Sequence, residues 1–321
     1  MNSGNLNPSP LYIILNAQSG KNDADKVTQL IEESCNAAHR IFYIYLIEQP
    51  EDLLKTAQQV VKSAGQHNGI VVIAGGDGAI NTVAHQALQE NCRVGLIPQG
   101  TFNYFARTHD IPDAPDEALQ IIMAEYHEPV QVGLVNDQTF LVSASIGLYP
   151  ELLETREVFQ THLGRGRVIA FMAGLYTLFL NRQIIHIILE TQTERRKLET
   201  PSLYVANNRL QLQNIGIAEA DHIEQGKLVA IIPQPLTTRL GIMRLLFLGM
   251  LGDLGKHENI LTFAFEKMNV RLARFLGAHV KVAIDGEIIR LKAPLDFSVS
   301  AQALLLIKPD PNSVDSLEKK S

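Results

Sequence analysis

The chain has 321 residues, of which 46% are hydrophobic and 19% are charged. This composition excludes an intrinsically disordered protein and, at about 150 residues per domain, predicts two domains. The net charge of −6, from 34 acidic and 28 basic residues, gives no overall positive field that would attract nucleic acid. The two cysteines, Cys35 and Cys92, form no CxxC or CxxH pair, which excludes a thiolate zinc site and a disulfide framework.

Cysteine usage and the N-terminus both favour a reducing compartment. Residues 1–10 are polar and lack a basic region, so they do not predict a signal peptide. The longest apolar stretch, 168–180, is about 13 residues long, whereas a helix that crosses a bilayer needs about 20. We therefore expect a cytoplasmic protein without a transmembrane segment.

The first third of the chain alternates short β-branched runs with amphipathic stretches. The predicted strands and helices follow one another as βαβαβαβ at 11–15, 24–38, 41–47, 51–64, 69–74, 79–89 and 93–97. Such alternation predicts a parallel sheet between helices, with ligands at the carboxyl ends of the strands. A further helix at 116–125 is predicted to end this α/β domain, which we assign to residues 1–129.

From residue 130 onward the pattern changes to strands separated by turns. These strands are predicted at 139–146, 183–190, 202–206, 227–232, 281–284, 288–291 and 304–307. Clustered strands with few helices predict a β-sandwich, which we assign to residues 130–309. Two helical stretches, 158–180 and 237–254, interrupt it, and the polar tail 310–321 is predicted to be disordered.

The third predicted strand leads through Gly75-Gly76-Asp77-Gly78 directly into a helix. Glycines let backbone N–H groups approach an anion, which also meets the positive end of the helix. Asp77 would repel a phosphate unless it holds a cation, accepts a proton or binds a ribose. The alternative is that Asp77 caps the helix and the glycines only make the turn.

Two more polar glycine turns follow the first and fourth predicted strands. Residues 16–21 are Asn-Ala-Gln-Ser-Gly-Lys, and residues 98–103 are Pro-Gln-Gly-Thr-Phe-Asn, whose hydroxyl and amide are expected to bind phosphate oxygens. Because carboxyl ends of parallel strands meet at one edge of a sheet, the three turns predict a nucleotide-binding crevice. The GxxxxGK[ST] pattern is absent, so the chain is not a P-loop enzyme.

Four motifs in this order resemble the diacylglycerol kinase catalytic-domain family, which includes soluble bacterial lipid kinases and sphingosine kinases. They are Asn-x-x-Ser-Gly at 16–20, Gly-Gly-Asp-Gly-x-x-Asn at 75–81, Pro-x-Gly-Thr-x-Asn-x-Phe-Ala-Arg at 98–107, and Asp285-Gly286-Glu287. The resemblance implies an N-terminal Rossmann-like domain, of the type found in NAD kinases and diacylglycerol kinases, and a C-terminal β-sandwich. It also implies transfer of the γ-phosphate of ATP, with Mg²⁺, to a lipid hydroxyl in the cleft between the two domains.

The same resemblance implies roles for single residues. We expect Asp285 to be the catalytic base with Glu287 as its partner, and Asp77 to organise Mg²⁺ or the triphosphate. Sphingosine kinases are instead usually assigned the aspartate of Gly-Gly-Asp-Gly as base, and the residues alone favour a hairpin turn at Asp285-Gly286. The residues expected to bind ATP are Asn16, Ser19, Gly20, Gly75, Gly76, Asp77, Gly78, Asn81, Gly100, Thr101 and Asn103.

The chain departs from the family pattern at several positions. The family usually has other residue types at four positions, which in this chain are Ile47, Ala79, Phe102 and Tyr104. Some bacterial members bind a regulatory Mg²⁺ through an aspartate where this chain has Gln225. Such a second site would need Asp221 or Glu224 as a substitute ligand.

Three alternatives to a lipid kinase stay open. An NAD kinase shares Gly-Gly-Asp-Gly, but the Asn-Glu pair expected to contact its acceptor ribose is absent. The departures favour a catalytically weak lipid-binding or regulatory protein, and a sugar kinase is the third option.

A lipid substrate would bring the protein to the inner face of the membrane, where the apolar segment 238–251 could lie, although a buried helix explains that segment as well. A second copy of the chain is a further candidate partner, in a homodimer.

Overall fold

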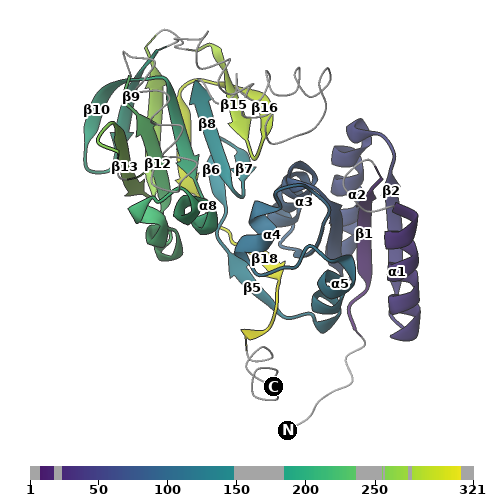
Figure 1. Cartoon of the computed structure of the whole chain (residues 1–321). Coiled ribbons are helices and arrows are strands. Elements are labelled where there is room, and N and C mark those ends of the chain that lie inside the picture. The colour runs from purple at the N-terminus through teal and green to yellow at the C-terminus, as the bar shows by residue number, and fades with distance from the viewer. Residues whose placement is uncertain are drawn as a thin grey trace, which may run out of the picture. The chain divides into compact units, whose positions relative to one another are not determined.

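The computed structural model describes residues 8–17, 24–147, 184–235, 255, 257–273 and 277–311. The chain divides into two compact units, drawn in Figure 1. Unit 1 comprises Met1–Val130 with Gln302–Ser321, and unit 2 comprises Gln131–Ala301. The helical stretches predicted at 158–180 and 237–254, and all but the first two residues of the predicted tail, lie outside the described residues. No helix in the described ranges is long and apolar enough to cross a membrane.

Unit 1 is a six-stranded sheet with helices on both faces. Its elements are β1 (Leu11–Asn16), α1 (Ala24–Ala37), β2 (Phe42–Ile47), η1 (Pro50–Asp52), α2 (Leu53–Gln66), β3 (Ile70–Gly75), α3 (Asp77–Gln89), β4 (Arg93–Pro98), α4 (Tyr104–Thr108), α5 (Pro115–Ala124), β5 (His127–Val130) and β18 (Leu304–Ile307). The strand order is β2-β1-β3-β4-β18-β5, and the first four strands pair in parallel. The predicted α/β architecture is therefore confirmed.

The apolar runs explain this sheet. Every residue of β3 is buried, as is nearly all of β1 and β4, because helices cover both faces. Helix α2 packs beside α3, and α1 packs beside α5. The chain moves from β1 to β2 in one direction along the sheet and then back in the other direction to β3 and β4. Because crossovers of this kind are right-handed, α1 lies on one face of the sheet and α2 and α3 lie on the other.

The strand predicted at 304–307 forms β18 in unit 1. It pairs in parallel with β4 and antiparallel with β5. Leu304, Leu306 and Ile307 are buried in this position. The chain thus returns at its far end to the sheet with which it begins.

Unit 2 consists of two six-stranded antiparallel sheets, β10-β9-β14-β17-β6-β7 and β13-β12-β11-β8-β15-β16. Its elements are β6 (Gly133–Val135), β7 (Gln138–Phe140), β8 (Ser143–Gly147), β9 (Ile185–Thr191), β10 (Arg195–Thr200), β11 (Ser202–Ala206), α8 (Arg209–Asn214), η2 (Ala218–Gln225), β12 (Leu228–Pro233), β13 (Ile260–Phe265), β14 (Lys267–Leu272), β15 (His279–Ile284), β16 (Glu287–Lys292) and β17 (Leu295–Val299). The two sheets share one hydrophobic core, so the predicted β-sandwich is confirmed.

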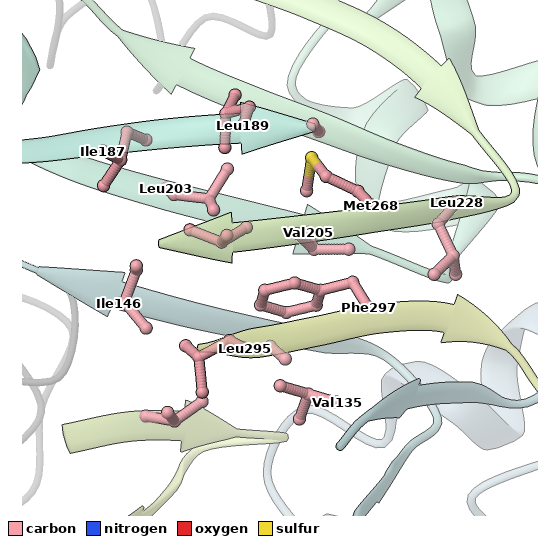
Figure 2. Close-up of a cluster of buried hydrophobic side chains, with 14 of the residues drawn as sticks. Val135, Ile146, Ile187, Leu189, Leu203, Val205, Leu228, Met268, Leu295 and Phe297 are labelled. Carbon is pink, nitrogen blue, oxygen red and sulfur yellow. The ribbon is translucent and has the colours of Figure 1, made fainter. Parts of the chain in front are cut away.

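Figure 2 shows how the two sheets fill this core. Phe297 and Leu295 of β17 lie near Ile146 of β8 and Val205 of β11, and all four side chains are fully buried or nearly so. Residues that alternate along each strand supply the inward-facing side chains, as the period of two in a β-strand requires. Both sheets therefore contribute side chains to the core.

The strand predicted at 139–146 is two strands in two different sheets. Strand β7 ends at Phe140 and β8 begins at Ser143. Between them, the backbone N–H groups of Leu141 and Val142 donate to the carboxylate of Asp285. These two N–H groups are therefore not available for pairing between strands, and the chain passes here from one sheet to the other.

We predict that Gly133→Ala lowers the free energy of unfolding of unit 2 by about 1–3 kcal/mol, because it overpacks the core. A Cβ at Gly133 would lie 2.3 Å from the ring of Phe140, which is fully buried. Denaturant unfolding measures the effect. The matched control is the double variant Gly133→Ala/Phe140→Leu, which should lose less stability than the two single changes added together. Unchanged stability in Gly133→Ala would contradict this packing.

A second prediction concerns acid stability in unit 1. The pKa of His109, at the end of α4, is lowered from 6.5 to about 4, mainly by burial and to a smaller extent by Lys308, while Glu128 opposes the shift. Its ring packs edge-on against Phe105 at 4.9 Å. The unfolded chain binds this proton at higher pH than the folded one, so the free energy of unfolding should fall as pH drops from about 6.5 to about 4.

His109→Leu should reduce this loss, measured as the slope of stability against pH in denaturant titrations. The control is His39→Asn, at an exposed position whose φ of 50° suits asparagine. This variant should keep the wild-type slope. Equal slopes in wild type and His109→Leu would show that His109 does not couple to folding.

Candidate functional site

The three glycine turns begin at the same edge of the unit 1 sheet. Strands β1, β3 and β4 are neighbours in parallel register and end at Asn16, Gly75 and Pro98. The turns that follow them therefore leave the sheet at its carboxyl edge, where α/β sheets bind ligands. Ser19 and Gly20 of the first turn lie outside the described residues.

The turns after β3 and β4 touch each other through their backbones. The N–H of Gln99 donates to the carbonyl of Gly75 at 2.9 Å. A Cβ at Gly100 would lie 3.1 Å from the Cα of Gly76 and 2.7 Å from Oδ1 of Asn103. Only glycine fits at position 100 without moving one of these groups.

Asp77 joins the two turns. It is the first residue of α3, and Gly76 is the N-cap. The backbone N–H of Asn103 donates to Oδ2 of Asp77 at 3.1 Å. The helix thus begins two residues earlier than predicted. The Asp77 carboxylate accepts a hydrogen bond from the neighbouring turn, whereas the capping alternative expected it to cap the helix.

The N-terminus of α3 makes this edge attractive to anions. The first N–H groups of a helix have no acceptor within the helix, and the aligned peptide dipoles place partial positive charge there. Gly76 and Gly78 are half-buried, so their backbone is within reach of a ligand that enters the turn. Asn81 follows on the next turn of α3 and is also half-buried, whereas Thr101 is exposed.

The turn after β4 ends in an unusual backbone conformation. Asn103 has φ 49° and ψ 40°, in the left-handed region, and only 2% of it is exposed. Its Nδ2 donates to Oδ1 of Asp113 at 2.8 Å, and the other oxygen of Asp113 accepts from Nη2 of Arg107 at 2.6 Å. The hydrogen bond that Arg107 donates to Asp113 is also the main reason why the pKa of Arg107 is raised.

Sequence reasoning missed Asp113. It stands between two prolines in Ile111-Pro112-Asp113-Ala114-Pro115, a stretch that indicates only a loop and the start of a helix. Nothing in its spacing pairs it with Asn103. The contact arises because the chain folds back after α4.

Phe102 and Tyr104 flank Asn103 with two stacked rings. The ring centroids lie 5.7 Å apart and the planes are within 3° of parallel. Phe102 remains 40% exposed. At two of the positions where the sequence departs from the family pattern, the turn thus carries two stacked aromatic rings.

In unit 2, Asp285 and Gly286 form the two-residue loop of the β15–β16 hairpin. Ile284 pairs with Glu287, and the loop residues have φ values of 47° and 93°. Positive φ at both loop positions is typical of the type I′ turn, which Asp-Gly favours. The hairpin expected from the residues alone is therefore present, and Glu287 is exposed at the start of β16.

The carboxylate of Asp285 is held by three backbone N–H groups. Oδ1 accepts from Val142 at 2.9 Å and from Ser143 at 2.8 Å, and Oδ2 accepts from Leu141 at 2.8 Å. The N–H of Asp285 in turn donates to the carbonyl of Ser143 at 2.9 Å. Such donors stabilise the ionised carboxylate and fix its orientation.

The carboxylates that a second Mg²⁺ site would need are engaged by an arginine. Arg209 forms ion pairs with Asp221, at 3.1 Å, and with Glu224. Gln225 ends η2, and Gly226 follows in the left-handed conformation. Among the described residues, no cluster of three or more His, Cys, Asp or Glu could hold a metal ion. A metal site at this loop therefore gains no support.

Comparison with known proteins agrees with these observations. Residues 10–135 match the diacylglycerol kinase catalytic domain. An uncharacterised protein of Synechocystis sp. is 23% identical over 94% of this chain and 71% of its own length. A probable lipid kinase YegS-like of Serratia proteamaculans is 28% identical over 52% of this chain, and one of Citrobacter koseri is 33% identical over 37%.

The chain spans about half the length of these two relatives, 54% and 42% respectively. The fold extends further. A structure described as a putative diacylglycerol kinase from Bacillus anthracis covers 95% of this chain and 98% of its own, with a TM-score of 0.73 and 20% identity. The matched segment contains the glycine turns after β1, β3 and β4, and on this evidence residues 10–135 belong to the diacylglycerol kinase catalytic-domain family.

Proposed function

We propose that this protein is a lipid kinase that transfers the γ-phosphate of ATP to the hydroxyl of a diacylglycerol-like lipid. The observation that carries the proposal is the contact between the turns after β3 and β4 at the N-terminus of α3. This contact places the glycine backbone of the two turns beside the carboxylate of Asp77, whose orientation is fixed. Phosphoryl transfer needs mainly positioning and neutralisation of charge, and this arrangement can supply both.

The nucleotide would bind at the carboxyl edge of the unit 1 sheet. Backbone N–H groups of the two contacting turns and the positive end of α3 would hold the triphosphate. The residues proposed to bind ATP are Asn16, Ser19, Gly20, Gly75, Gly76, Gly78, Asn81, Gly100, Thr101 and Asn103. The small size of the glycines supports this, because it leaves the backbone open to the phosphates.

Asp77 is the residue proposed to hold Mg²⁺. This ion is commonly bound by one or two carboxylates together with substrate phosphates and water, so a single aspartate beside the triphosphate fits it. Bound there, Mg²⁺ would neutralise charge on the phosphates. The fixed orientation of Asp77, through the N–H of Asn103, supports this role.

Asp285 is the proposed catalytic base. Its ionised form, stabilised by three N–H donors, would orient the acceptor hydroxyl and take its proton late in the transfer, when the forming bond to phosphorus has made that proton acidic. Glu287 would assist from the neighbouring end of the hairpin. An acceptor of this kind is found in membranes, so we propose that the protein acts at the cytoplasmic face.

A radiolabelled assay tests the proposed reaction. Incubation with γ-labelled ATP, Mg²⁺ and a total lipid extract should move label into the chloroform phase, and omission of lipid should abolish the transfer. Label on NAD in a lipid-free reaction would instead favour the NAD kinase alternative. No transfer to either acceptor by protein that binds ATP would contradict the proposal.

We predict that Asp285→Asn lowers lipid phosphorylation at least about 100-fold, because a general base contributes about 10²–10⁴ in rate. The affinity for ATP should change less than about twofold, since the substitution leaves unit 1 untouched. The new amide places an NH₂ or an oxygen opposite three N–H donors, so thermal melting must confirm the fold. Asp137→Asn, at an exposed turn of the same unit, is the matched control and should retain full activity. Folded Asp285→Asn with wild-type turnover would exclude this base.

A further inference from the structure

We infer that Asp113 sets the direction of the Asn103 amide and thereby determines which chemical group the turn after β4 offers to a bound nucleotide. Asp113 is a positioning residue in this account, since it acts through Asn103. The inference rests on the proposed nucleotide site in unit 1. It concerns contacts inside that unit alone.

The main chain of Asn103 is fixed before its side chain is considered. The residue occupies the left-handed region with φ 49°, and its N–H donates to Oδ2 of Asp77 at 3.1 Å. It is 98% buried, since only 2% is exposed. Only the orientation of the side-chain amide of Asn103 remains open. Its nitrogen and oxygen are almost equal in size, so packing alone does not select between the two orientations.

Asp113 decides this rotation. A carboxylate only accepts hydrogen bonds, so the 2.8 Å contact to Oδ1 of Asp113 must be made by the Nδ2 end of Asn103. Arg107 holds the second carboxylate oxygen at 2.6 Å and so fixes the direction of Asp113 itself. Arg107, Asp113 and Asn103 thus form a chain of hydrogen bonds that leads from the surface into the turn.

The consequence is that the oxygen of Asn103 faces the glycine turn. Oδ1 would lie 2.7 Å from a Cβ at Gly100. It is buried, and it has no hydrogen-bond partner among the residues that the structure describes. A buried acceptor without a partner costs free energy, which a bound donor or cation would recover.

The ligand group that fits this oxygen is a hydrogen-bond donor or a cation. A phosphate oxygen does not fit, because it is itself a negatively charged acceptor. The sequence suggested that the Asn103 amide binds phosphate through its nitrogen, whereas this geometry assigns the nitrogen to Asp113. Within a bound nucleotide complex, the fitting groups are a ribose hydroxyl, the amino group of adenine and Mg²⁺.

Calorimetry with the non-hydrolysable analogue AMP-PNP tests the inference. Asp113→Ala should weaken binding of AMP-PNP with Mg²⁺ by about tenfold, the expected loss for one charge-assisted hydrogen bond. The Asp113 side chain is 48% exposed, so the melting temperature should change little. Asp110→Asn removes an exposed carboxylate of the same loop at a φ of 56° that asparagine tolerates, and it should bind as wild type does.

An exchange of the two side chains gives a sharper test. Asn103→Asp alone places a carboxylate against Asp113 and should bind the analogue at least about tenfold more weakly than wild type. Asn103→Asp combined with Asp113→Asn lets the new amide donate to the new carboxylate, whose second oxygen still faces Gly100. This double variant should recover most of the lost affinity. A role for the Asn103 nitrogen as phosphate donor predicts no recovery.

The same titrations identify the ligand group. If the effect of Asp113→Ala requires Mg²⁺, the cation is the partner of Oδ1. If the effect persists in EDTA, its disappearance with a deoxyribose analogue identifies a ribose hydroxyl, and its disappearance with the inosine analogue identifies the amino group of adenine. Wild-type affinity in Asp113→Ala, or an exchange variant no better than Asn103→Asp, overturns the inference while the nucleotide site stands. A wild-type protein that binds no nucleotide overturns both.

Discussion

The close approach of Gly76 and Gly100 is the constraint on which the candidate site depends. A side chain at position 100 would meet the Asn103 oxygen at 2.7 Å and the Gly76 backbone at 3.1 Å, so it would force the two turns apart. The hydrogen bond from Asn103 to Asp77 spans the same gap. Because β3 and β4 are neighbouring parallel strands, the sheet delivers both turns to one place, and the glycines allow them to touch.

Both units fix an aspartate by the same means. Asp77 accepts an N–H from the neighbouring turn, and Asp285 accepts three N–H groups from the segment that links β7 to β8. Backbone donors hold a carboxylate more rigidly than long side chains do, because they lose little further freedom when they bind. For a reaction that depends on orientation and charge, such preorganisation is what the protein can contribute.

The regular parts of the fold could be predicted from the sequence, because they depend on local patterns. The apolar runs of β1, β3 and β4 and the Asp285-Gly286 hairpin follow from residues adjacent in the chain. The break between β7 and β8 could not be predicted, since the group that takes their N–H donors lies more than 140 residues away. The same holds for the place of β18 beside β4 and for the hydrogen bond between Asn103 and Asp113.

The most direct test of the account is a crystal structure of the protein with AMP-PNP and Mg²⁺. The account predicts a triphosphate over the backbone of residues 75–78 and Gly100, with the metal ion beside Asp77. A nucleotide bound in another part of the protein, with these turns empty, would contradict it.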